Sequence, residues 1–204
     1  MPKNLLVLMG SPRKGGNSST LAMESVRNAR EDGAQVECHR LHDMNIRPCR
    51  ACEECRHGEA KMCVQDDDMQ LLYPKLKDAD AILIAGPVYW FTIGAQTKLF
   101  MDRLYALGSQ KGYGLRGKKI GIILTYADED PFRSGAVNAL RAFQDSFRYV
   151  GADIVGMVYG AGSKAGEVRN NTHLMAKAAQ LGKRLVEGER DEGAKGQRDE
   201  GAKG

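Results

Sequence analysis

The sequence has no long apolar run, little net charge and no recognisable targeting segment. Its longest apolar stretches are far too short to cross a bilayer, so we expect no membrane span. Met1 to Asn4 leads directly into an apolar stretch, which predicts no secretory signal and a cytoplasmic protein. The net charge of +4 is spread along 204 residues. That distribution argues against nucleic-acid binding and against a small acidic electron carrier.

Hydrolytic motifs are also missing. No Ser–His–Asp set, paired carboxylates or H-E-x-x-H pattern stands out, so we name no catalytic residue. Neither the dinucleotide G-x-G-x-x-G fingerprint nor the P-loop pattern occurs at the first turn. The four histidines form no metal-ligand spacing. His39, His42 and His173 are expected to be structural or exposed, whereas His57 could replace one sulfur of the cysteine cluster described below.

What the chain does have is a glycine-rich turn after its first apolar run. Leu5 to Met9 predicts a buried parallel strand, Gly10 to Gly16 a tight turn, and the following residues a helix N-terminus. The unpaired N–H groups of a helix start favour an anion, and Arg13 adds a cation. The sequence therefore predicts a phosphate site. An ordinary strand-to-helix turn capped by Asn17 or Ser18 would have the same sequence pattern.

Apolar strands and amphipathic helices alternate along the rest of the chain. Strands are expected over 5–9, 34–41, 81–86, 119–126 and 154–159, and helices over 18–32, 69–77, 95–107, 136–149 and 171–186. This alternation predicts an α/β fold, a doubly wound five-stranded parallel sheet of flavodoxin-like order 2-1-3-4-5. Ligands of such sheets bind where strands one and three diverge.

The expected third strand ends in an aromatic loop at that same edge. Pro87 to Trp90 carries the only tryptophan of the chain, and Phe91 follows it. Flat rings and backbone groups there could line a planar ring system. A hydrophobic plug or an oligomer contact would use the same residues.

Three motifs together resemble a known family. They are Gly10-Ser-Pro-Arg-Lys-Gly-Gly-Asn-Ser18, Gly86-Pro-Val-Tyr-Trp90 and Ala95-Gln-Thr-Lys-Leu-Phe-Met-Asp-Arg103. They are similar to the NAD(P)H-dependent FMN reductase branch of the flavodoxin-like proteins, and most of all to its iron–sulfur flavoproteins. The resemblance implies FMN as cofactor, bound by Ser11, Arg13, Asn17, Ser18, Ser19, Pro87, Val88, Tyr89, Trp90, Thr125, Tyr126 and Ala127.

A cysteine-rich stretch interrupts the alternation. Residues 43–68 fit no periodic element, and they contain C-x2-C-x2-C-x7-C, which suggests a metal site in a cytoplasmic chain. The family resemblance implies a 4Fe–4S cluster, while zinc and metal-free thiols remain open. The ligands would be Cys49, Cys52, Cys55 and Cys63. Cys38 is expected to be a small core residue.

The resemblance also implies a function. We expect an FMN-dependent oxidoreductase that moves electrons from NAD(P)H or a ferredoxin-like donor to a small acceptor such as a quinone, dioxygen or peroxide. A cluster-free FMN or quinone reductase and a non-catalytic metal-knotted electron carrier or interaction module are the alternatives. The family implies a homodimer or homotetramer.

Composition divides the chain into two parts. We expect residues 1–187 to form the FMN-binding domain, with residues 43–68 as an insertion. Residues 188–204 repeat Arg-Asp-Glu-Gly-Ala-Lys-Gly and lack large apolar side chains, so we expect a disordered tail.

Overall fold

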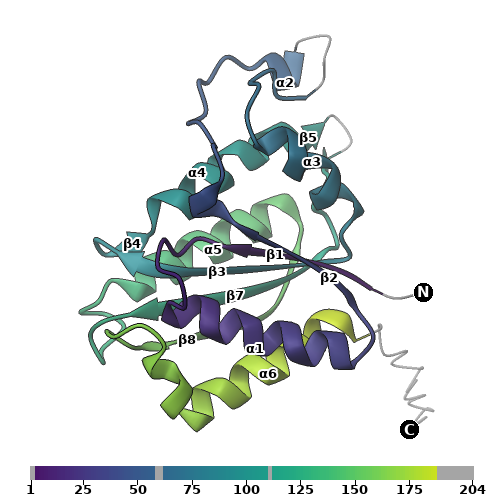
Figure 1. Ribbon diagram of the computed structural model, residues 1–204. Coiled ribbons are helices and arrows are strands. Elements are labelled where there is room, and N and C mark those ends of the chain that lie inside the picture. Colours follow the sequence, from purple (N-terminus) through teal and green to yellow (C-terminus); the bar gives the residue numbers. More distant parts are fainter. Residues whose placement is uncertain (1–2, 58–61, 110–111, 188–204) are drawn as a thin grey trace, which may run out of the picture.

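A central parallel sheet organises the computed structural model, which describes residues 3–57, 62–109 and 112–187 (Figure 1). In the described chain its main strands are β1 (Asn4–Met9), β2 (Gln35–Arg40), β3 (Ala81–Tyr89), β7 (Lys119–Tyr126) and β8 (Asp153–Ala161). They lie in the order β2-β1-β3-β7-β8, and each neighbouring pair is parallel. The flavodoxin-like order predicted from the sequence is confirmed.

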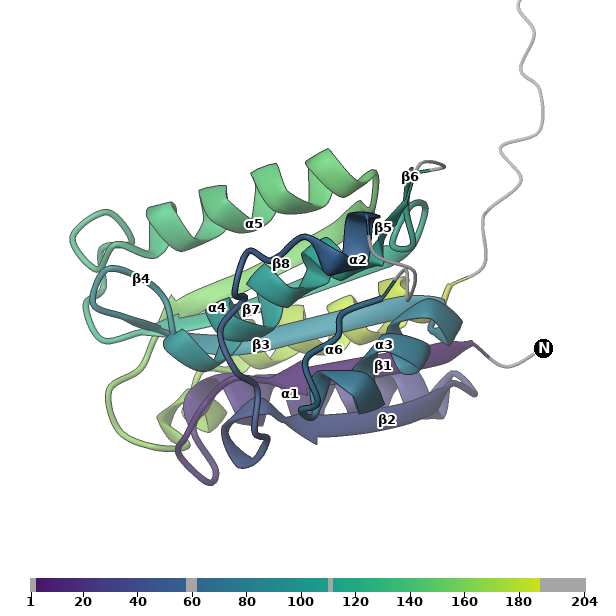
Figure 2. The ribbon, with the colours of Figure 1, turned by 90° about the horizontal axis from the view of Figure 1, so that it is seen from above.

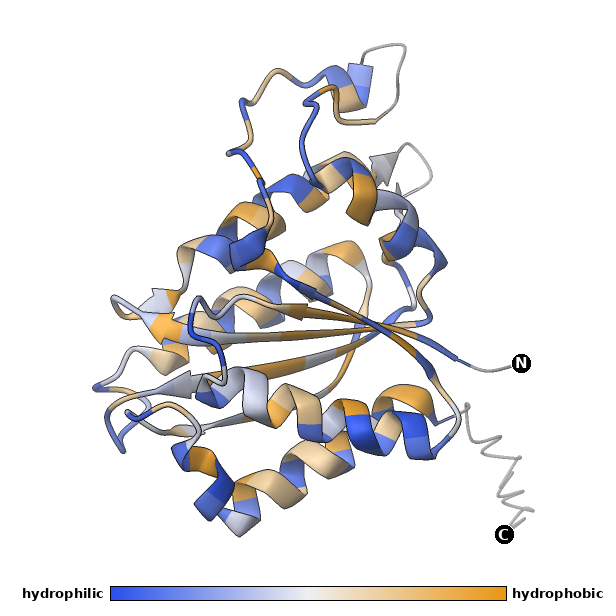
Figure 3. Ribbon diagram, viewed as in Figure 1, coloured by the Kyte–Doolittle hydropathy of each residue, from blue (hydrophilic) through white to orange (hydrophobic). Residues whose placement is uncertain are grey.

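Helices cover both faces of this sheet. Helices α1 (Asn17–Glu31) and α6 (Thr172–Val186) lie on one face, and α3 (Met69–Asp78), α4 (Ala95–Arg103) and α5 (Ala136–Val150) lie on the other (Figure 1). Side chains alternate along β1, because successive residues of a strand point to opposite faces. Leu5 and Val7 join the apolar cluster with α1 and α6, whereas Leu6 and Leu8 join the other cluster. Figure 3 shows the apolar residues concentrated in the strands and on the inner sides of the helices.

Short elements complete the described chain. They are η1 (Leu41–Asp43), α2 (Glu54–His57), β4 (Thr92–Ile93), η2 (Leu104–Leu107), β5 (Gly108–Ser109), β6 (Gly112–Tyr113) and η3 (Glu167–Asn170). The helix expected over 95–107 is regular only to Arg103, and η2 continues it as a tighter turn. The third strand runs three residues further than expected, to Tyr89, and pairs with β4.

The cysteine-rich stretch forms a separate layer. Residues 44–68, called here the cysteine segment, rise from the end of β2 and cross over α3 and α4 (Figures 1 and 2). Its regular element in the described part is the four-residue helix α2. The segment therefore lies on the outside of the three-layer core, into whose apolar cluster it inserts Ile46.

No helix in the described ranges is both long enough and apolar enough to cross a membrane. The repeated tail, residues 188–204, lies outside the described residues, so the expectation of disorder there stays a prediction.

Candidate functional site

A cavity of about 320 Å³ lies at the carboxyl ends of β1, β3 and β7. This is the edge at which ligands of doubly wound sheets bind, and the volume is at the lower end of the usual range for small-molecule sites. Segments far apart in sequence meet there. The cavity is lined by Ser11, Arg13, Gly16, Asn17, Ser18, Pro87, Val88, Tyr89, Thr125, Tyr126, Ala127, Gly162 and Ser163.

The first turn leaves the start of α1 open for an anion. Gly16 is its N-cap residue; this helix, described in full, has no side-chain cap and no acidic residue in its first turn. The hydroxyl oxygen of Ser18 is buried and has no hydrogen-bond partner among the described residues. A buried donor without a partner is costly, and a phosphate oxygen would satisfy it. The turn therefore fits the phosphate of FMN.

Contacts from a distant loop fix this turn. Arg13 Nη1 donates to the Ser163 carbonyl at 3.1 Å, and Asn17 Oδ1 accepts from the Val168 backbone N–H at 3.4 Å. Both partners follow β8, and a Cβ on Gly162 would lie 2.6 Å from the Asn17 amide nitrogen. The loop after β8 thus approaches the turn closely and forms one wall of the cavity.

The opposite wall comes from the ends of β3 and β7. Pro87, Val88 and Tyr89 line it together with Thr125 to Ala127. Burial raises the pKa of Tyr126, and the neighbouring Tyr159 and Asp130 raise it further, so its hydroxyl stays protonated at neutral pH. This wall offers flat groups, backbone and a neutral hydroxyl to a planar ring.

Two predicted contacts, Ser19 and Trp90, do not line the cavity. Ser19 lies in a neighbouring basic hollow of about 450 Å³ with Arg40 and Arg169, because successive residues of a helix point about 100° apart. Trp90 occupies the β3–β4 turn with φ of 48° and is 92% exposed. Its contact with the ring stays a prediction.

The sequence prediction missed the glycine-rich loop after β8. Gly162 and Ser163 line the cavity from there, and Gly16 lines it from the first turn. A usable signal existed, since Gly160 to Gly166 follows the last strand at the same sheet edge. A Cβ on Gly16 would lie 2.7 Å from the Ser11 hydroxyl, so this turn needs glycine there.

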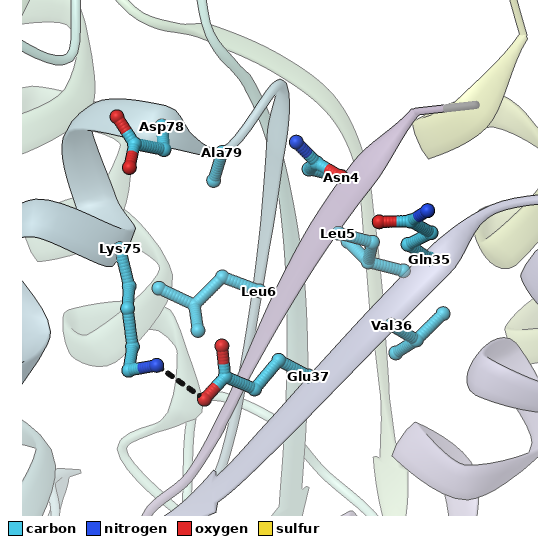
Figure 4. A pocket seen from close by; sticks show the side chains of 9 residues that line it. All are labelled: Asn4, Leu5, Leu6, Gln35, Val36, Glu37, Lys75, Asp78 and Ala79. Carbon is cyan, nitrogen blue, oxygen red and sulfur yellow. Dashed lines mark ion pairs between the residues drawn. The ribbon is translucent and has the colours of Figure 1, made fainter. Parts of the chain in front are cut away.

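Another hollow lies near the amino-terminal ends of β1 and β2 (Figure 4). Two of its three charged side chains are paired with each other, since Lys75 Nζ lies 2.6 Å from Glu37 Oε1. Ligands of open α/β sheets bind at the opposite edge. We therefore assign the functional site to the carboxyl edge.

The predicted metal ligands all lie on the cysteine segment. Cys49 and Cys52 are exposed, and Cys55 and Cys63 are half-buried. Cys55 is close enough to Cys63 and Cys49 to feel their charges. In the ranges that the structure describes, no three His, Cys, Asp or Glu side chains are grouped to hold a metal ion. The four thiols fit an iron–sulfur cluster in chemistry, but their positions in the described chain do not converge.

The two half-buried thiols differ in their electrostatics. Burial raises the pKa of Cys55, and the nearby Cys63 raises it further. Burial also raises the pKa of Cys63, but the Gln65 backbone N–H and the Arg103 guanidinium outweigh it and leave the pKa below its ordinary value. Arg103 Nη2 lies 3.2 Å from Cys63 Sγ. Of the two half-buried thiols, Cys63 is therefore the one that loses its proton more readily, as a metal ligand or a reactive thiol must.

Comparisons with known proteins agree with this geometry. The family model for NADPH-dependent FMN reductases matches residues 4–182. An iron–sulfur flavoprotein of Archaeoglobus fulgidus is 34% identical over 184 residues, which is 88% of this chain and 77% of that protein. An iron–sulfur flavoprotein of Methanocaldococcus jannaschii is 30% identical over 185 residues, which is 88% of this chain and 94% of that protein.

A solved structure has the same fold. The NAD(P)H:quinone oxidoreductase of Methanothermobacter marburgensis superposes with a TM-score of 0.65 at 19% identity, over 93% of this chain and 100% of that one. The family match covers nearly the whole described chain. The chain therefore belongs to the NADPH-dependent FMN reductase family and is an FMN-dependent oxidoreductase.

Proposed function

We propose that this protein is an oxidoreductase of the iron–sulfur flavoprotein type, which holds FMN in the carboxyl-edge cavity. It passes electrons from NAD(P)H or a ferredoxin-like donor to a small acceptor such as a quinone, dioxygen or peroxide. Bound FMN supplies both hydride and single-electron transfer. The unpartnered Ser18 hydroxyl at the start of α1 is the observation that carries the proposal.

The residues divide the binding of FMN between two walls. Ser11, Asn17, Ser18 and the backbone of α1 hold the phosphate, and Arg13 neutralises its charge. The ends of β3 and β7 hold the ring and exclude water from one of its sides. The role of the protein is to bind and orient the cofactor. Hydride transfer to the flavin needs no side chain that donates or accepts a proton.

Neighbouring serines of α1 test this site. Ser18→Ala removes the buried hydroxyl and should weaken FMN binding about 10- to 100-fold, the value of one hydrogen bond to a charged group. Ser19→Ala is the matched control, since its side chain faces the adjacent hollow. Fluorescence titration of the full apoprotein with FMN measures both. Equal FMN affinity for wild type and Ser18→Ala would refute this phosphate site.

We also propose that Cys49, Cys52, Cys55 and Cys63 bind a 4Fe–4S cluster. The support is the four-thiol donor set, the lowered pKa of Cys63 beside Arg103 and the names of the two archaeal relatives. Since these thiols do not converge in the described chain, we derive no electron path through the cluster.

Metal analysis decides this second proposal. Protein purified anaerobically should contain about four iron and four sulfide per chain, besides FMN. Cys52→Ala should lose the iron and keep FMN. Cys38→Ala is the control, because Cys38 lies in β2, away from the segment. A yellow wild-type protein without iron would leave a cluster-free FMN reductase.

A further inference from the structure

The cysteine segment is attached to the core by two arginines that reach in opposite directions. Arg103 extends from the end of α4 into the segment, and Arg56 extends from α2 of the segment onto the core. Neither side chain lines the FMN cavity. The segment also inserts Ile46 into the apolar core cluster, and Met44 and Met62 pack against that cluster, so the two arginines add polar contacts to an apolar attachment.

Arg103 joins the incoming and outgoing arms of the segment. Its side chain is 1% exposed and donates to the Arg47 carbonyl at 2.8 Å and to Asp67 Oδ1 at 3.1 Å. The same guanidinium donates to Cys63 Sγ at 3.2 Å. Both terminal nitrogens of this buried guanidinium therefore have acceptors, while Nε has no hydrogen-bond partner among the described residues.

Arg56 forms the second attachment, on an aromatic surface of the core. Its guanidinium carbon lies 4.3 Å from the ring centroid of Tyr105 and 5.0 Å from that of Tyr113. Nη2 also donates to the Tyr113 hydroxyl at 2.6 Å. A Cβ on Gly108 would overlap the guanidinium, so a glycine at the start of β5 makes the space for it. The contact combines cation–π attraction with a charged hydrogen bond.

Each attachment adjoins one of the two half-buried cysteines. Arg56 follows Cys55 directly in the chain, and Arg103 bonds Cys63. Cys49 and Cys52, by contrast, are exposed. The two residues that flank Cys52, Ala51 and Glu53, have positive φ angles of 51° and 59°. Of the four proposed cysteine ligands, Cys55 and Cys63 are thus the two that the arginines hold in place.

We propose that Arg56 is a positioning residue. It docks α2 on Tyr105 and Tyr113 and so fixes Cys55 beside Cys63, whether or not iron is bound. The docking itself is independent of the proposed cluster, whereas its consequence for iron retention rests on that proposal. Arg103 positions Cys63 in the same way. Because Arg103 is buried against Asp67, substitutions of Arg103 are expected to unfold the protein, so Arg56 is the residue to test.

Hydrogen exchange of the full FMN-loaded protein, treated to remove any iron, tests the docking. Arg56→Gln should speed amide exchange in residues 49–57 about tenfold, and Tyr113→Phe should speed it less, because the ring remains. Arg50→Gln is the matched control: it removes the same charge from an exposed position of the same segment. Wild-type exchange rates in Arg56→Gln would overturn the proposal.

A second readout separates positioning from general stability. FMN affinity and the thermal midpoint of the core should stay at wild-type values in Arg56→Gln, while iron is lost faster to a chelator. Equal losses of FMN affinity and core stability would overturn the proposal, since Arg56 would then be an ordinary structural residue. A wild-type protein that never binds iron would refute the proposed cluster. The exchange rates would still show whether Arg56 docks α2 on the core.

Discussion

At the scale of single residues, Asp67 shows how a local pattern hides a long-range role. The run Asp66 to Asp68 directly precedes α3, and Asp67 Oδ1 accepts from the Met69 backbone N–H at 3.1 Å, as a helix cap would. Its main partner, however, is Arg103, at the end of α4. Asp68 bonds instead to the Asn45 backbone N–H at 2.7 Å. The carboxylate of Asp67 therefore joins the core to the cysteine segment.

Asp67→Asn should lower the free energy of unfolding by about 3–5 kcal/mol, because it leaves the buried guanidinium of Arg103 without its counter-charge. Urea unfolding of the FMN-saturated protein at pH 7 measures this. Asp66→Asn is the control, since its side chain is exposed. Equal stability of the two variants would contradict a strong buried pair.

The same pair predicts a pH dependence. Burial raises the pKa of Asp67, but the hydrogen bonds from Arg103, Arg47 and Met69 outweigh it and leave the pKa below its ordinary value. A lowered folded-state pKa stabilises the protein above the unfolded-state pKa of about 3.9, and this contribution is lost as the pH falls through the folded-state value. The difference between wild type and Asp67→Asn should therefore shrink below about pH 4. A difference that grows on acidification would contradict this assignment.

At the scale of elements, α4 spans the distance between the two sites. Its first turn packs against the sheet edge through Thr97, whose buried hydroxyl has no hydrogen-bond partner in the described chain. A Cβ on Gly10 would overlap this hydroxyl, and one on Gly86 would lie 3.1 Å from it. The last residue of α4 is Arg103. Gly10 just after β1 and Gly86 within β3 thus set how closely α4 packs on the sheet.

Gly10→Ala should push α4 away from the sheet edge. We expect a loss of about 1–3 kcal/mol in unfolding free energy, typical of an overpacked core, together with weaker FMN binding. Thr97→Ala removes the clashing oxygen, so the double variant should recover part of both losses. Denaturant unfolding and FMN titration of all four proteins form the cycle. Strictly additive losses would show that the two side chains do not collide.

At the scale of the whole molecule, the described fold ends where its core ends. Val186, the last residue of α6, is still packed in the apolar cluster of α1 and α6, and the family match ends at residue 182. Lys119 Nζ donates to the Glu187 carbonyl at 2.6 Å. We therefore propose residues 1–187 as the FMN-binding domain.

Deletion of residues 188–204 should leave the unfolding free energy within about 0.5 kcal/mol of wild type, because these residues include no large apolar side chain that could join a core. FMN affinity and iron content should also be unchanged. Thermal unfolding and FMN titration of the shortened chain measure this. A marked loss of FMN would give the tail a role in binding and contradict the proposed domain boundary.

The sequence by itself determined the layered fold and the place of the site. Alternating apolar strands and amphipathic helices permit few topologies, and right-handed crossovers bring the glycine turn and the Pro87 loop to one sheet edge. Tertiary structure alone decided which neighbours face the cavity, because a helix turns Ser18 inward and Ser19 aside. It also decided the pairing of Asp67 with Arg103 and of Arg56 with Tyr113. No local pattern encodes such contacts, since each joins side chains more than thirty residues apart that only the packed core brings within reach.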